Sequence, residues 1–176
     1  MRNAVRILAA LAGLAAPLAA QREPVVVVLP GQPTRVVSDE MGTPIAHAAP
    51  RHQVFQALIK VYKRLDIPIT LQDSVSGTVG NLKFHKSRKL GGERISSYLS
   101  CGSGMTGPHA DAYRVHMAVR SVAAPGRDGG TILRSLFFAG ALDVAGGAKQ
   151  AMPCESNGRF EILIGMMVQA ELDGPS

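Results

Sequence analysis

The stretch "YRVHMAVR", residues 113–120, alternates large apolar side chains with smaller or charged ones. Every second residue from Tyr113 to Val119 is apolar, and the residues between them include Arg114, His116 and Arg120. This period of two is typical of a strand with one buried face and one face in water. It is the clearest element of the sequence, and it predicts a half-covered sheet at the centre of the fold.

The segments on both sides of this strand predict its partners. The run "APGRDGG" at 124–130 is dense in turn formers, and an apolar run at 131–144 then pairs back. The period of that apolar run is ambiguous because large side chains occupy both of its faces. Upstream, "DSVSG" at 73–77 separates two alternating segments, and Leu82 and Phe84 continue the alternation in the second. Sequential hairpins predict an antiparallel sheet of four to five strands.

Two main helices are expected, one before and one after the sheet segments. Residues 51–65 carry an apolar stripe at helical spacing, directly after Pro50. Residues 158–172 carry a second stripe, and Ser156 or Asn157 can cap its start. Both stripes need an apolar surface to cover, so we expect the two helices to pack on one face of the sheet.

The remaining segments connect these elements. We expect a short helix over 93–99 and a loop over 146–158, where "GGAKQAMPCESNG" combines glycines with a proline. Because the strands come in sequential pairs between helices, the sequence predicts a single α+β domain over 51–173.

The N-terminus is typical of a secretory signal peptide over residues 1–20. Arg2 and Arg6 precede the uncharged stretch "ILAALAGLAAPLAA", which ends in small residues and is too short to span a bilayer. We therefore expect an exported protein, periplasmic or extracellular. Gln21 follows instead of a lipidation cysteine, and no later segment is long and apolar enough to cross a membrane.

Residues 21–50 are predicted to form a proline-rich, extended arm. Five prolines interrupt this stretch, and each removes a backbone donor and restricts the residue before it. A short strand is expected at 34–37. The valine-rich run Val25–Leu29 is expected to be an edge strand or a segment that docks on the domain, because it would promote aggregation if left exposed.

The chain contains two cysteines, Cys101 and Cys154. In an exported protein an even number of cysteines predicts a disulfide, because thiols outside the cytosol meet oxidants. Such a bond would close a loop from residue 101 to residue 154, and for a loop of this length the chain-entropy contribution to stability is about 4 kcal/mol. The sequence therefore predicts that one disulfide stabilises the domain.

The segment "SCGSGMTGPHAD", residues 100–111, allows two chemical interpretations. Its glycine spacing matches a dinucleotide-binding loop, but such a loop follows a strand and opens a helix, and here the expected order is reversed. Alternatively, Cys101 and His109 could be the nucleophile and base of a small thiol-dependent hydrolase. A disulfide would remove that nucleophile. Asp111 is expected to accept hydrogen bonds from nearby backbone amides.

Neither a catalytic residue nor a metal or cofactor site is predicted elsewhere. The chain has five histidines, and none forms a pair with metal-ligand spacing. The formal net charge is +6, and it is +4 once Arg2 and Arg6 of the predicted signal peptide are removed. The chain contains no tryptophan. Such a mild basic excess with few aromatic side chains does not predict nucleic-acid binding.

The basic stretch at residues 83–94 is the candidate interaction surface of the chain. If the strands pair suitably, two arginines of the central strand join it. The predicted anion-binding set is then Lys83, Lys86, Arg88, Lys89, Arg94, Arg114 and Arg120. Such a surface could bind anionic lipid head groups, a polyanionic glycan or an acidic envelope protein. The alternative is a strand face whose charges only keep the protein in solution.

One segment resembles part of a group of small, uncharacterised exported bacterial proteins. The residues that carry the resemblance are Tyr98, Leu99, Cys101, Gly102, Gly107, Pro108, Ala110, Asp111 and Tyr113. More loosely, the order of helices and antiparallel strands is similar to helix-grip domains, such as those of the accessory lipoprotein in outer-membrane barrel assembly. The resemblance implies an exported α+β domain and no particular activity.

Together these patterns predict an exported, non-enzymatic binding or scaffold protein of the bacterial cell envelope. Two alternatives stay open: the hydrolase that uses Cys101 and His109, and a carrier that holds a lipid or another apolar ligand between helix and sheet. The oligomeric state is not predicted.

Overall fold

A computed structural model describes residues 25–33, 35–37 and 42–174 of the chain. The predicted signal peptide, residues 1–20, lies outside the described residues. Within them, no helix is long and apolar enough to cross a membrane.

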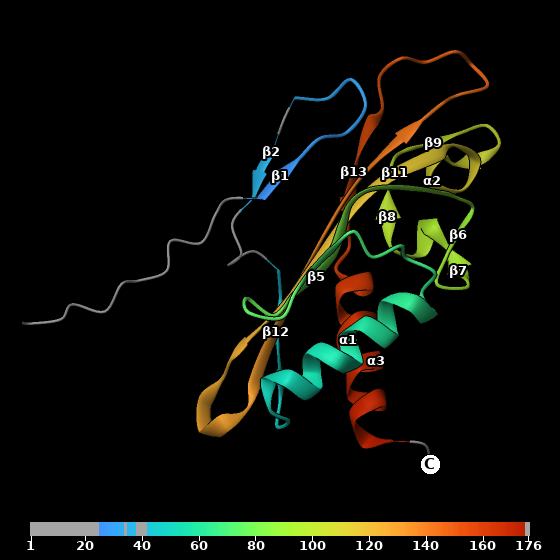
Figure 1. Ribbon diagram of the computed structural model, residues 1–176. Coiled ribbons are helices and arrows are strands. Elements are labelled where there is room, and N and C mark those ends of the chain that lie inside the picture. The colour runs from blue at the N-terminus through green and yellow to red at the C-terminus, as the bar shows by residue number, and fades with distance from the viewer. Residues whose placement is uncertain (1–24, 34, 38–41, 175–176) are drawn as a thin grey trace, which may run out of the picture.

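The protein is an α+β domain built on one antiparallel sheet, as predicted (Figure 1). The sheet has seven strands, which is more than the four to five expected. Six follow one another across the sheet in the order β4 (Leu71–Asp73), β5 (Thr78–Ser87), β11 (Arg114–Pro125), β12 (Thr131–Leu142), β13 (Met152–Ser156) and β8 (Leu99–Ser100). The seventh, β3 (Pro44–His47), pairs with β12 beyond the end of β13.

The additional strands lie where the sequence predicted no strand. β13 lies in the segment expected to be a loop, and β3 lies in the expected arm, so the sheet begins before residue 51. β8 and the three-residue 3-10 helix η1 (Ile95–Ser97) replace most of the short helix expected over 93–99. These strands are short, and β3 and β13 each contain a proline. They are held by pairing with β12 and with each other rather than by a local sequence pattern.

The hairpin of β11 and β12 is the centre of the sheet, as the opening stretch of the sequence predicted. It is in register over twelve residue pairs, from Arg114 opposite Leu142 to Pro125 opposite Thr131. Large apolar side chains of β12 are covered on both faces, since Phe137 packs in the main core and Leu136 in a second cluster on the other face. This double covering explains the ambiguous period of the apolar run.

Helices α1 (Arg51–Arg64) and α3 (Arg159–Asp173) both pack on one face of the sheet, hereafter the inner face (Figure 1). Their buried stripes confirm the predicted ones, and Phe160 of α3 packs its ring against Phe137, with 4.6 Å between the ring centroids. Gly165 permits the close approach of α3 to β3, because a Cβ at this position would lie only 2.2 Å from Cδ1 of Ile45.

A small two-stranded ribbon lies on the opposite face of the sheet, hereafter the outer face (Figure 1). It consists of β1 (Val25–Val27), β2 (Arg35–Val37) and the described residues 28–33 between them. Val27 and Leu29 are buried against Ala118 and Leu136 of the outer face. The valine-rich run is therefore both a strand and a docking segment, and the residues that follow it form part of the folded domain.

Short elements fill the turn regions. They are β6 (Lys89–Leu90), β7 (Glu93–Arg94), β9 (Ser103–Gly104), β10 (Gly107–Pro108), α2 (His109–Ala112) and the 3-10 helix η2 (Arg127–Gly129). β6 pairs with β7, and β9 pairs with β10.

Candidate functional site

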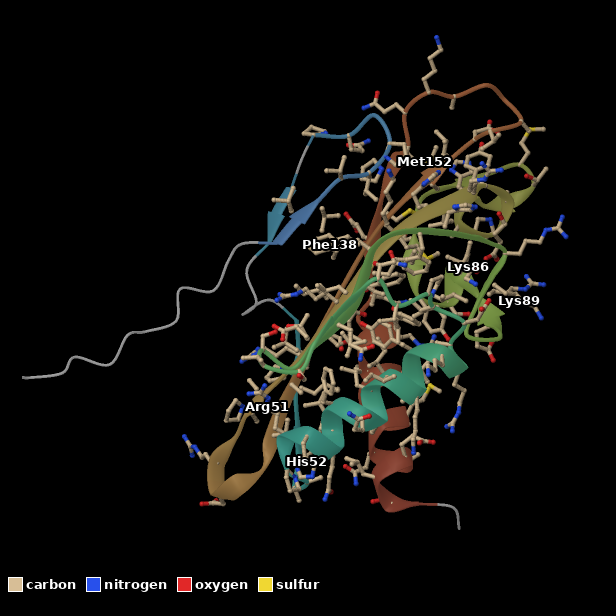
Figure 2. All side chains as sticks on the ribbon, in the orientation of Figure 1. Arg51, His52, Lys86, Lys89, Phe138 and Met152 are labelled. Carbon is tan, nitrogen blue, oxygen red and sulfur yellow. A yellow bond between two sulfur atoms is a disulfide. The ribbon has the colours of Figure 1, made fainter. Side chains whose placement is uncertain are left out.

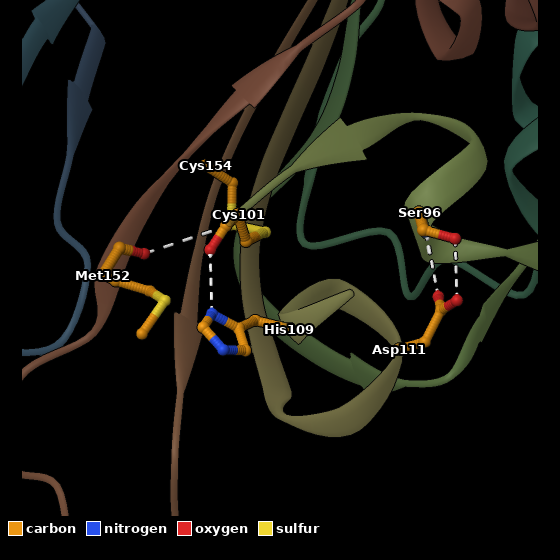
Figure 3. Close-up of a disulfide and its surroundings, with 6 residues drawn as sticks. All are labelled: Ser96, Cys101, His109, Asp111, Met152 and Cys154. Carbon is orange, nitrogen blue, oxygen red and sulfur yellow. Dashed lines mark hydrogen bonds between the residues drawn. A yellow bond between two sulfur atoms is a disulfide. The ribbon is translucent and has the colours of Figure 1, made fainter. Parts of the chain in front are cut away.

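The two cysteines form the predicted disulfide (Figure 3). Cys101 and Cys154 are 53 positions apart, and their Cα atoms lie 4.2 Å apart. The bond joins the end of β8 to β13, beside the backbone pair of Ser100 and Glu155. Because both sulfurs are bonded to each other, Cys101 offers no thiolate in this structure, and a thiol-dependent reaction would first require reduction.

His109 has structural contacts on several sides. Its backbone N–H donates to the Gly102 carbonyl at 3.0 Å, and its Nδ1 lies 3.3 Å from the Cys101 carbonyl oxygen (Figure 3). Its ring stacks on Tyr113 with 4.7 Å between centroids. The tight turn needs glycine at Gly102, which has a φ of +77°.

Asp111 does not orient His109. Its carboxylate accepts hydrogen bonds from the backbone N–H and the hydroxyl of Ser96, at 2.9 and 2.7 Å, and its side chain points away from the imidazole (Figure 3). This confirms the expected bond between Asp111 and a backbone amide. The glycine-rich segment therefore packs around a histidine and anchors η1, and its residues are not arranged as a nucleophile, a base and an orienting acid.

The predicted anion-binding residues are divided among several places. Lys86 forms an ion pair with Asp66, and it lies with Lys89 at the side of the domain away from the ribbon (Figure 2). Arg88, Lys89 and Arg94 are exposed in and beside the β6–β7 hairpin. Lys83 and Arg114, by contrast, lie in the two neighbouring strands β5 and β11. The seven side chains thus do not form one continuous surface.

Arg120 is not part of an accessible basic surface, because its side chain is buried. The residue is only 8% exposed, and its guanidinium donates to the hydroxyl of Thr78 across the β5–β11 pair at 3.5 Å. An arginine in this position supports the packing of the sheet, and it is not available to a large anionic surface.

A bulge in β5 decides which side chains face outward. Phe84 pairs with Met117 and Asn81 pairs with Val119, so two residues, Leu82 and Lys83, lie opposite Ala118 alone. The Asn81 side chain fixes this irregularity, since it accepts a hydrogen bond from the Lys83 N–H at 2.8 Å and donates to the Pro68 carbonyl at 2.7 Å.

The bulge reverses the alternation of β5. Leu82 packs in the outer-face cluster whereas Phe84 packs in the main core, so the two residues lie on opposite faces and the sequence-based expectation of one shared face was wrong. The reversal brings Lys83 and His85 onto the outer face, opposite the strand that carries His116.

Four cationic or ionisable side chains therefore gather on the outer face: Lys83, His85, Arg114 and His116. We name them the outer-face cationic cluster. His85 and His116 are direct cross-strand partners with ring centroids 5.7 Å apart. Arg114 and Lys83 are both close enough to act electrostatically on His116.

A cavity of about 230 Å³ lies beside this cluster, between the ribbon and the sheet. The ribbon contributes Val28, Leu29 and Pro30, and the sheet contributes Lys83, Phe84, His116 and Met117. Most of the lining is apolar, and the cationic side chains lie on the sheet side. A mostly apolar pocket with a few convergent polar groups is typical of small-molecule sites.

The imidazole of His116 is the unusual group in this pocket. Its Nε2 is buried and has no hydrogen-bond partner among the residues that the structure describes. Burial lowers the pKa of His116, and the neighbouring charges of His85, Arg114 and Lys83 lower the pKa further. No acidic side chain of the described part of the chain contributes to this shift. An anion in the pocket would supply a counter-charge to these cations.

The structure also bears on the predictions about metals and apolar carriers. The described residues contain no group of three or more histidine, cysteine, aspartate or glutamate side chains that could hold a metal ion. Between the helices and the sheet, where an apolar ligand was considered, core side chains such as Tyr62 and Phe160 fill the space. The cavity described above lies on the other face.

Of the four members of the cluster, the predicted anion-binding set contained Lys83 and Arg114 but neither histidine. The basic stretch included Lys83, and the central strand supplied Arg114 and His116. The bulge was missed, although a polar Asn81 in mid-strand and the mismatched phases of Val79 and Phe84 were signals for it. The ribbon's contribution was also missed, because docking of the arm depends on tertiary contacts.

Comparison with models of known protein families found no match, and comparison with curated proteins found none either.

Proposed function

We propose that the protein is an exported, non-enzymatic binding module of the bacterial cell envelope that binds an anion at the outer-face cationic cluster. The observation that carries this proposal is the gathering of Lys83, His85, Arg114 and His116 beside a cavity, where no described acidic side chain contributes to the pKa shift of His116. The disulfide supports export, because such bonds persist in oxidising compartments. The bonded sulfurs also support a binding role over a thiol-dependent reaction, because neither cysteine offers a nucleophile.

A bound anion should stabilise the protonated form of His116. We therefore expect the pKa of His116 to rise when an anion occupies the cavity, because a negative charge close to an imidazole favours the imidazolium ion. The test is an NMR titration of the histidine ring C–H signals, with and without saturating inorganic phosphate or hexanoate as probe anions. The two probes cover a compact polar anion and one with an apolar tail.

Two charge-matched double variants locate the effect. Lys83→Met/Arg114→Met removes two cations from the cluster, and Lys89→Met/Arg94→Met removes two from the β6–β7 hairpin. We expect the first pair to abolish the response of His116 to the anion and the second to preserve it. The proposal is overturned if neither probe changes the titration of His116, or if both double variants respond alike.

A further inference from the structure

We infer that the ligand of this site is a short alkyl carboxylate of about six carbon atoms. This inference rests on the proposed function and names the chemistry of its ligand. It follows from three properties of the cavity under the ribbon: the apolar and cationic residues in its lining, its volume, and the ammonium group of Lys83.

The lining combines apolar and cationic residues. Val28, Leu29 and Pro30 come from the ribbon, and the sheet contributes Lys83 and His116 together with Phe84 and Met117. A purely polar anion would leave the ribbon's apolar side chains in contact with water. An alkyl chain removes that apolar surface from water, which contributes about 0.8 kcal/mol, or about fourfold in affinity, per buried methylene.

The volume sets the length of the chain. A water molecule occupies about 30 Å³ of liquid, so a cavity of about 230 Å³ has room for roughly eight groups of that size. Hexanoate has the same number of non-hydrogen atoms. Shorter acids would leave part of the apolar lining uncovered, and longer ones would extend beyond it.

The charge on the sheet side matches a carboxylate. Lys83 provides an ammonium group, and the imidazole of His116 also lines the cavity. A carboxylate accepts a charge-assisted hydrogen bond from the ammonium group, and its negative charge offsets the cations that act on His116. Phosphate is also an anion, but it has no apolar part.

The ribbon is held in place by contacts outside the cavity, so the pocket exists before a ligand binds. The Ala151 N–H donates to the Pro30 carbonyl at 2.9 Å, and the Gln32 side-chain amide donates to the Ala151 carbonyl. Leu29 lies over Gly140, where a Cβ would be 3.3 Å from its Cδ1. A preformed pocket lowers the entropic cost of binding a small ligand.

The experiment is a binding series on the mature protein with its disulfide intact, measured by calorimetry and by the ring signals of His116. We expect hexanoate to bind about fifteenfold more tightly than butanoate, because two methylenes are added, and octanoate to gain little more. Hexanol and hexylammonium have similar chains without the negative charge. They should bind at least tenfold more weakly than hexanoate.

Two single variants test the role of the ammonium group. Lys83→Met should weaken hexanoate binding about tenfold and should reduce the discrimination against hexanol. Lys89→Met removes the same charge from the β6–β7 hairpin and should leave both unchanged (Figure 2). A thermal unfolding curve for each variant shows that it is folded before binding is measured.

The outcomes separate this inference from the function on which it rests. If phosphate or butanoate binds as tightly as hexanoate does, a ligand with a six-carbon chain is ruled out while anion binding stands. If hexanol binds as tightly as hexanoate, the carboxylate is likewise ruled out. If no anion perturbs His116, both the inference and the proposed function fail.

Discussion

Polar side chains are arranged differently on the two faces of the sheet. On the inner face, the Tyr62 hydroxyl lies 3.0 Å from Ser121 Oγ, which lies 2.7 Å from Ser135 Oγ, and helices cover this chain of hydrogen bonds. On the outer face, His85 and His116 stand beside Lys83 and Arg114, and no described acidic side chain contributes to the pKa shift of His116. The first arrangement completes its own hydrogen bonds, whereas the second gathers cations that a bound anion would offset.

This difference separates stability from binding within one sheet. Buried hydroxyls that bond to each other remove the cost of burying them, so they stabilise the fold without offering a site. Cations that face one another lower stability slightly, and such an arrangement is typical of a position where an anion binds. We therefore expect substitutions on the inner face to change stability most and substitutions on the outer face to change binding most.

The largest expected effect comes from neighbouring phenylalanines that lie on opposite faces of β12. Phe137 is 5% exposed and packs against Phe160, whereas Phe138 is only partly buried, on the outer face. Phe137→Ala should lower the free energy of unfolding by about 3–5 kcal/mol, and Phe138→Ala by roughly half of that. Urea denaturation of both variants measures the difference. Equal losses would show that the outer face is as important to stability as the inner one.

The second largest loss of stability is expected from breaking the disulfide, which lies at the edge of the sheet and not on either face. Cys101→Ser should cost about 4 kcal/mol of stability in the chain-entropy model, and Cys154→Ser should cost the same. The double variant should cost no more than either single variant, because all three break one bond. Thermal unfolding of the three variants tests this, and clearly unequal shifts of the singles would contradict it.

The two faces also differ in how much of them the sequence could predict. The alternation of residues 113–120, the helix stripes and the cysteine pair predicted the inner core, both helices and the disulfide, because each is a local pattern or a simple pairing of two residues. The outer face depends on register. Whether Lys83 faces His116 is decided by a bulge of one residue, and a shift of one residue moves every side chain to the other face.

The short strands and the ribbon were beyond sequence reasoning for a related reason. β13 contains Pro153 and β3 begins with Pro44, and neither has a strand pattern of its own. They form because β12 offers unpaired backbone groups, which must find partners when buried. Likewise, Val27 and Leu29 dock because the outer face presents Ala118 and Leu136. Such contacts exist only once the sheet has formed.

A smaller effect on stability, with a clear effect on binding, is expected from Asn81. Asn81→Ala removes the acceptor of the Lys83 N–H and the donor to the Pro68 carbonyl, which should cost about 2 kcal/mol. Because the bulge directs Lys83 and His85 outward, the variant should also weaken hexanoate binding. Urea denaturation and calorimetry measure the two effects, and the interpretation fails if binding is unchanged while stability falls.

The smallest expected effect is a pH dependence of stability that originates on the outer face. The pKa of His116 is lowered in the folded protein, first by burial and then by the charges of His85, Arg114 and Lys83, while the unfolded chain keeps the ordinary value of 6.5. Below that pH the unfolded chain binds more protons at this position than the folded protein does. Stability should therefore fall as the pH drops through 6.5 towards the lowered pKa of His116.

His116→Gln should remove this part of the pH dependence, and hexanoate should reduce it in the unsubstituted protein. Both follow from one cause, because a bound carboxylate raises the pKa of His116 towards that of the unfolded chain and so makes protonation less costly. His52→Gln removes an exposed histidine from α1, far from the ribbon, and is the matched control (Figure 2). Urea midpoints between pH 5 and 8 provide the measurement. A slope that is the same in His116→Gln and in the unsubstituted protein would mean that the cations of the outer face do not act on His116, and the contrast between the two faces would then lose its electrostatic basis.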